Sequence, residues 1–119
     1  MPRLNAADLA TALGRLSGWT AANNEIGKTF VFGNFVEAIA FVNRVAELAE
    51  AARHHPDIDI RYNRVRIVLT TRDDGGVSEK DTALAGAIEG MGASGVEGRR
   101  VRGEGMRRVE SGEKRVRGR

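Results

Sequence analysis

The chain has 119 residues, of which 41% are hydrophobic and 29% charged, a composition typical of one globular domain. Its formal net charge of +3 is unevenly distributed, because residues 1–91 hold 10 basic and 12 acidic side chains whereas residues 92–119 hold 9 and 4. The basic character therefore belongs to the C-terminal stretch and does not indicate a polyanion-binding domain. The absence of cysteine excludes a disulfide framework and any thiolate metal site. Since no segment has the apolar length of a membrane span or the apolar region of a secretory signal, we expect a cytoplasmic protein with no membrane contact.

A helix followed by a hairpin is predicted for the first part of the chain. Asn5 can cap the helix through its side-chain oxygen, and leucine and alanine then recur at helical spacing until Gly18. Residues 19–22 and 26–32 flank a turn at residues 23–24, and the second of these runs is rich in β-formers. They predict the first two strands of a sheet.

A second helix is predicted from Asn34 to about Ala52. Asn34 and Glu37 have the spacing of a capping box, and apolar residues then form two stripes along the helix. So wide an apolar arc indicates that a sheet covers one side of the helix and that further protein, such as another subunit, covers the other. Pro56 ends the segment, because a residue before proline avoids helical angles.

A second hairpin and a third helix complete the pattern. Apolar and polar residues alternate along residues 57–62 and 64–69, which predicts two strands with one buried face. Ser78 and Asp81 have the capping-box spacing of a helix that we expect to run to about Gly90. The order αββαββα predicts an α+β domain with a four-stranded antiparallel sheet and helices packed on one face.

We place the end of this domain at residue 91 and interpret residues 92–119 as a basic Gly/Arg-rich tail that is disordered. The tail holds seven of the 15 glycines and no aromatic residue, so it cannot bury enough apolar surface to offset the entropy of ordering. Nucleic-acid binding through the tail is the weaker alternative, because four glutamates dilute its charge and no aromatic side chain can stack on bases. The arginines of the tail are Arg99, Arg100, Arg102, Arg107, Arg108, Arg115, Arg117 and Arg119.

The adjacent pair His54 and His55 contains the only histidines of the chain. Imidazole titrates near neutral pH and can act as a base or an acid, so the pair is a candidate for proton transfer. The alternative is a structural role, in which an imidazole interacts with the last carbonyls of the second helix. No metal is expected, because sequence neighbours rarely point at one ion and the nearby Asp57 and Asp59 lie on the polar face of a strand. Phosphate-binding glycine motifs and nucleophile elbows are absent, which leaves general acid–base chemistry as the enzymatic option.

Further residues form a specific pattern around this pair. They are the run from Glu50 to Pro56, which includes His-His-Pro, then Tyr62, Thr70, Thr71, Gly75, Gly76 and the run from Ser78 to Asp81. Over residues 4–91 this pattern resembles the pterin-4a-carbinolamine dehydratase family. The resemblance implies an enzyme that eliminates water from 4a-hydroxytetrahydrobiopterin, giving quinonoid dihydrobiopterin in the recycling of tetrahydrobiopterin. It also implies the αββαββα fold, no metal or organic cofactor, and a homodimer or homotetramer.

The resemblance implies a set of site residues as well. Glu50, one helical turn before His54, is expected to orient an imidazole, with a solvated surface carboxylate as the alternative. Asp81 is expected to face the pocket as a catalytic residue, with a simple cap of the third helix as the stronger alternative. Trp19 and Tyr62 are interpreted as core or sheet residues, with the edge of the site as the alternative. The implied catalytic residues are His54, His55, Asp81 and Glu50, and the implied substrate-binding residues are His54, His55, Pro56, Thr71, Arg72, Asp73 and Asp74.

Arg72 stands where the family usually has a third histidine. Arginine stays protonated at neutral pH and cannot replace a general acid or base, although it can bind the polar edge of a pterin. We therefore expect reduced activity. The second hypothesis is a non-catalytic interaction protein, because the resemblance extends to a dimerisation cofactor of a transcription factor and to Rubisco assembly factors. Both histidines favour the enzyme, whereas Arg72 and the basic tail favour the interaction protein.

Overall fold

Helices and strands alternate in the order αββαββα in the computed structural model, which describes the backbone of residues 2–95 and the side chains of residues 2–91. The strands form one antiparallel sheet in the order β1-β2-β4-β3. The fold class expected from the sequence is therefore confirmed, and the ends of β1 and β2 differ from the prediction by one residue. In chain order the elements are α1 (Ala6–Leu13), β1 (Thr20–Ala22), β2 (Glu25–Val31), α2 (Phe35–Ala52), β3 (Asp57–Arg61), β4 (Arg64–Leu69), the 3₁₀ helix η1 (Arg72–Asp74) and α3 (Glu79–Gly95).

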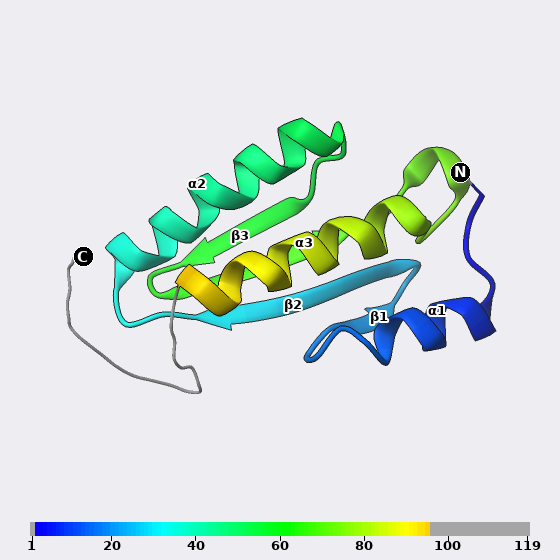
Figure 1. Ribbon diagram of the computed structural model, residues 1–119, viewed down its shortest axis with the longest axis horizontal. Helices are drawn as coiled ribbons and strands as arrows, with labels where there is room; N and C mark the ends of the chain where they lie inside the picture. The colour runs from blue at the N-terminus through cyan, green and yellow to red at the C-terminus, as the bar shows by residue number, and fades with distance from the viewer. Residues whose placement is uncertain (1, 96–119) are drawn as a thin grey trace.

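The strand register divides the sheet into an apolar and a polar face. Ile26 of β2 pairs with Leu69 of β4, and both side chains are buried on the same side of the sheet. α2 and α3 lie side by side across that side (Figure 1). On the opposite side, the exposed Arg66 donates a hydrogen bond from Nη1 to Thr29 Oγ1 at 3.2 Å. The two helices therefore cover one face of the sheet.

Aromatic side chains fill the space between α2 and the sheet. The ring centroid of Phe41 on α2 lies 4.7 Å from that of Phe30 and 4.9 Å from that of Phe32. Trp19 meets Phe30 edge-on at 6.2 Å. α3 adds the buried side chains Leu84, Ala85 and Ile88. The helical and alternating patterns of the sequence thus converge on one hydrophobic core.

α1 is shorter than the sequence pattern predicts. It begins after Asn5, whose Oδ1 accepts a hydrogen bond from the backbone N–H of Asp8 at 2.8 Å, but it ends at Leu13 rather than continuing to Gly18. The following turn keeps Leu16 buried. Because a turn and a helix can place this leucine on the same side, periodicity alone does not distinguish them.

α2 has the predicted bounds and caps. Asn34 Oδ1 accepts the N–H of Glu37 at 2.8 Å, and Glu37 Oε1 accepts the N–H of Gly33 at 2.9 Å. Part of its apolar arc is uncovered, because Phe35, the first residue of one predicted stripe, is 50% exposed. The exposed large apolar residues of the described chain are Val31, Phe35, Val36, Ile60 and Tyr62. Cover of this arc by another subunit stays a prediction.

α3 continues past the predicted end at Gly90 as far as Gly95. Met91 and Ala93 are good helix formers, and each added residue propagates an existing helix. The predicted boundary between residues 91 and 92 therefore falls inside α3. The rest of the predicted tail, residues 96–119, lies outside the described residues.

Within residues 2–95, no helix is long and apolar enough to cross a membrane. The cytoplasmic location expected from the sequence stays a prediction.

Candidate active site

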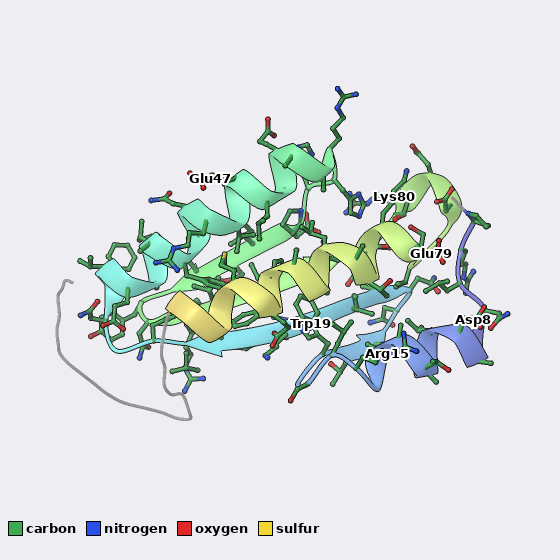
Figure 2. The ribbon with its side chains drawn as sticks, in the orientation of Figure 1. Asp8, Arg15, Trp19, Glu47, Glu79 and Lys80 are labelled. Carbon is green, nitrogen blue, oxygen red and sulfur yellow. The ribbon has the colours of Figure 1, made fainter. Side chains whose placement is uncertain are left out.

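Four segments that are separate in the sequence meet at one end of the molecule. They are the C-terminal end of α2, the start of β3, η1 and the first turn of α3 (Figure 1). Glu79 and Lys80 mark this end at the start of α3 in Figure 2. The predicted histidines, carboxylates and loop residues all come from these segments.

The backbone at the end of α2 orients the histidine pair. Arg53 adopts the left-handed conformation, with φ of 54° and ψ of 40°. Its N–H donates to Glu50 O at 3.2 Å, and the N–H of His54 donates to Ala49 O at 3.1 Å. These two bonds form a Schellman motif, which satisfies the last carbonyls of a helix and reverses the chain. Because Pro56 disfavours a further helical turn, the chain leaves α2 here and enters β3.

His54 points into the protein toward α3. Its Nε2 forms a hydrogen bond with Oδ1 of Asp81, a residue 27 positions later. The His54 side chain is 12% exposed and Asp81 is fully buried. A buried carboxylate needs partners of this kind, because leaving it unpaired costs several kcal/mol, on the order of 3–5. Asp81 and His54, both among the implied catalytic residues, are therefore in direct contact.

Two hydroxyl residues surround the other oxygen of this carboxylate. Thr71 Oγ1 donates to Asp81 Oδ2 at 2.8 Å, and the backbone N–H of Ser78 donates to the same oxygen at 2.9 Å. Ser78 Oγ in turn accepts the N–H of Lys80 at 3.2 Å. Asp81 thus caps α3, as its spacing from Ser78 predicts, and contacts His54 at the same time.

His55 lies in a more open environment. Its Nε2 is 2.5 Å from Glu50 Oε2, and the two side chains are 63% and 77% exposed. Helical spacing suggests that Glu50 faces His54, but the reversal at Arg53 turns His54 inward and leaves His55 beside Glu50. Each histidine therefore has its own carboxylate partner, one buried and one exposed.

The loop after β4 lies across from the end of α2. Thr71 is buried, whereas Arg72 and Asp73 are exposed. Arg72 Nη2 is 3.6 Å from Oδ2 of Asp57, the residue after Pro56. This ion pair connects η1 to the start of β3, and the Arg72 side chain is 79% exposed. Arg72 thus lies on the surface next to the chain segment that carries the histidines.

Other candidates lie away from these contacts. Trp19 is buried in the core, where its Nε1 donates to Glu89 Oε2 at 2.9 Å. Tyr62 follows the far end of β3 and is exposed. Among the described residues, no cluster of three or more His, Asp or Glu side chains could hold a metal ion.

Sequence reasoning missed the part that Thr71 and Ser78 take in this site. The family resemblance implies that Thr71 binds the substrate, but its hydroxyl turns inward to Asp81. The spacing of Ser78 and Asp81 signalled a helix cap and contained no sign of His54 or Thr71. A contact between residues so far apart in the chain has no local sequence signal.

Comparison with known proteins assigns the chain to a family. The family model described as pterin 4 alpha carbinolamine dehydratase matches residues 2–91. A protein of Chloroflexus aurantiacus, provisionally named a pterin-4-alpha-carbinolamine dehydratase, is 62% identical over 89 residues, which cover 75% of this chain and 96% of that protein. A protein of Thermomicrobium roseum with the same provisional name is 58% identical over 85 residues, covering 71% and 91%.

Two solved structures share the fold. The crystal structure of a transcriptional coactivator/pterin dehydratase from Brucella melitensis matches with a TM-score of 0.72 and 33% identity, over 75% of this chain and 97% of that chain. A pterin dehydratase-like protein identified as a RuBisCO assembly factor in the alpha-carboxysome matches with a TM-score of 0.51 and 26% identity, over 61% and 84%. Since the family match includes both histidines and both of their carboxylate partners, the chain belongs to the pterin-4a-carbinolamine dehydratase family, as its sequence pattern predicted.

Proposed function

We propose that the protein is a pterin-4a-carbinolamine dehydratase acting on 4a-hydroxytetrahydrobiopterin. The observation that supports this most directly is the pair of adjacent imidazoles, each hydrogen bonded to its own carboxylate. Two such groups at one end of the molecule suit a reaction that removes a proton from one atom and adds a proton to a neighbouring one. The names of the curated relatives point to the same reaction.

In this proposal the two histidines divide the proton transfers. The elimination forms a C4a=N5 double bond from the electrons of the N5–H bond while the C4a–O bond breaks. His54 accepts the N5 proton. The negative charge of the adjacent Asp81 carboxylate stabilises the positive charge that this transfer creates on the imidazole. His55, which is exposed, donates a proton to the departing 4a-hydroxyl, and the products are quinonoid dihydrobiopterin and water.

The remaining residues of the proposed site bind and orient. Glu50 orients His55, and Pro56 shapes the pocket next to the pair. Arg72 to Asp74 form the opposite lip, with the buried Thr71 behind it, and Arg72 supplies hydrogen-bond donors for the polar edge of the pterin. Because Arg72 cannot exchange a proton at neutral pH, we propose a slower reaction than an enzyme with a third histidine would have.

The direct test is dehydration of enzymatically generated 4a-hydroxytetrahydrobiopterin, followed through the absorbance of the quinonoid product. The protein should accelerate its formation, and a variant with both His54→Gln and His55→Gln should not. A wild-type rate equal to the uncatalysed rate at high protein concentration would sink the proposal.

The protein is also proposed to act as a homo-oligomer. β3 is an edge strand of the sheet, and exposed apolar side chains lie on β3 and at the start of α2. An unpaired strand edge and an uncovered apolar surface both favour association with a second copy. A homodimer or homotetramer would cover them.

A non-catalytic interaction protein is the second candidate. Arg72 in place of a third histidine favours it. The names of the two solved structures also mention interaction roles, since one is a transcriptional coactivator as well as a pterin dehydratase and the other is a RuBisCO assembly factor. Equilibrium titration with a reduced pterin separates the candidates. Absence of pterin binding, together with recovery of a large stoichiometric partner, would favour the interaction protein.

A further inference from the structure

The hydroxyls of Thr71 and Ser78 lie behind the His54–Asp81 pair. Thr71 is 5% exposed and Ser78 is fully buried, so neither hydroxyl is available on the surface. Thr71 Oγ1 is 2.8 Å from Asp81 Oδ2 and 2.8 Å from Ser78 Oγ. The hydrogen-bonded cluster therefore extends inward from the histidine to the start of α3.

The donors and acceptors of this cluster allow one arrangement of protons. A carboxylate oxygen only accepts, so Thr71 donates its single hydroxyl proton to Asp81 Oδ2. The hydroxyl of Ser78 must then donate to Thr71, while Ser78 Oγ accepts the N–H of Lys80. Oδ2 of Asp81 therefore accepts two hydrogen bonds, one from the Thr71 hydroxyl and one from the N–H of Ser78. Oδ1 is the oxygen that contacts His54.

The helix cap by itself does not require Thr71. The bonds from the N–H of Ser78 to Asp81 and from the N–H of Lys80 to Ser78 form the capping box of α3 without it. The Thr71 hydroxyl instead fixes the plane of the carboxylate, because it gives Oδ2 a second donor from a different chain segment. The orientation of Oδ1 toward His54 then depends on Thr71.

This arrangement determines which imidazole nitrogen carries the shared proton. Because Asp81 accepts hydrogen bonds from Thr71 and from the N–H of Ser78 as a carboxylate, the proton between Oδ1 and His54 lies on Nε2. Within the described residues, no protein atom is hydrogen bonded to Nδ1 of His54. We propose that Thr71 is a positioning residue that acts through Asp81 to hold His54 in the Nε2–H tautomer, so that Nδ1 exchanges the proton with the substrate. The proton exchange between Nδ1 and the substrate rests on the proposed dehydratase function.

The test compares three variants of the full chain by imidazole ¹⁵N NMR at about pH 9, where an ordinary imidazole is neutral. Thr71→Val removes the donor with little change in shape, and Thr71→Ser keeps it. Thr70→Val is the matched control, because Thr70 Oγ1 donates to Asn24 O at 2.7 Å instead of to Asp81. The spectrum of His54→Gln assigns the His54 signals.

The wild type, Thr71→Ser and Thr70→Val should show His54 as the Nε2–H tautomer, and Thr71→Val should show a mixture of tautomers. In the dehydration assay, Thr71→Val should lower kcat by about tenfold to a hundredfold, the effect of one hydrogen bond to a charged group, and Thr71→Ser should restore it.

Two spectroscopic results would overturn the positioning role. One is an Nδ1–H tautomer of His54 in the wild type. This result needs no variant, so it would reject the positioning role even if Thr71→Val does not fold. The other is a wild-type tautomer pattern in folded Thr71→Val. If the tautomer depends on Thr71 but the wild type does not dehydrate the pterin, the positioning role is supported and the role of Nδ1 in catalysis is rejected together with the proposed function.

Discussion

His54 and His55 are neighbours in the chain but have opposite environments. One imidazole is nearly buried against a buried carboxylate, and the other is largely exposed beside an exposed one. The hydrogen bond between His54 and Asp81 is shielded from water, whereas that between His55 and Glu50 competes with solvent. At the scale of single residues, Asp81 is therefore the partner whose loss has the larger effect.

The substitution Asp81→Asn tests this difference. It removes the charge next to His54 and replaces an acceptor in the cluster by an amide. We expect kcat for dehydration to fall about a hundredfold or more, as loss of support for a general base implies. The free energy of unfolding, measured in urea, should fall by about 1–3 kcal/mol, the effect of lost hydrogen bonds to a buried charged group.

A matched control for Asp81→Asn is Asp59→Asn on β3, where the exposed carboxylate pairs with the exposed Arg61. It should change the free energy of unfolding by less than about 0.5 kcal/mol, and kcat by less than the corresponding factor of about two. Equal losses in the two variants would contradict the special role of Asp81.

Arg72 provides a second test at this scale. Arg72→His introduces a titratable group at the lip, so turnover should rise by about tenfold or more if a third proton-transfer group is what the site lacks. Arg72→Ala should not raise it. Because the ion pair with Asp57 is exposed, stability should change by less than about 1 kcal/mol in both variants. Equal turnover in folded Arg72→His and wild type would argue against the proposed consequence of Arg72.

At the scale of elements, the end of α2 depends on one residue with an unfavourable backbone. The left-handed conformation of Arg53 closes the Schellman motif that turns His54 inward and brings His55 beside Glu50. Such a conformation costs a non-glycine residue about 1–2 kcal/mol, which the two backbone hydrogen bonds and the start of β3 offset. The site is therefore coupled to the termination of this helix.

Substitutions at Arg53 should separate this effect from side-chain contacts. Arg53→Val should lower the free energy of unfolding by about 1–2 kcal/mol, because a β-branched residue tolerates the left-handed region poorly. Arg53→Gly should be neutral or stabilising by up to about 1 kcal/mol. Urea denaturation checks both. As a control, Ala51→Val inside α2 should cost no more than about 0.7 kcal/mol, and a larger loss there than at Arg53 would contradict the argument.

At the scale of the whole molecule, helices cover only one face of the sheet, and the edge of β3 has no neighbouring strand among the described residues. Ile60 on this edge is partly exposed, and Phe35 and Val36 at the start of α2 are exposed as well. Burying these side chains against a second copy would remove apolar surface from water and pair the strand edge. The molecule is thus suited to association through this side.

Ile60→Lys should weaken this association, because a lysine on the edge strand places a charge within the proposed interface. Sedimentation velocity over a range of concentrations should show a lower mean mass than for the wild type. Ala87→Lys, at an exposed position of α3, should leave the mass unchanged. A monomeric wild type, or equal dissociation in the two variants, would contradict the proposed interface.

The sequence by itself determined the kinds of element, their order and the fold class, because helical and alternating periodicities are local properties of the chain. It also identified the histidine pair and the family through a specific run of residues. It was less accurate for the ends of α1 and α3, where a turn or a run of small residues continues the same pattern.

Only the tertiary structure decided how the site residues are paired. The contact of Asp81 with His54, of Glu50 with His55 and of Thr71 with Asp81 depends on the reversal at Arg53 and on the packing of α3 beside α2. Such contacts join side chains from separate segments, and local propensity carries no information about them.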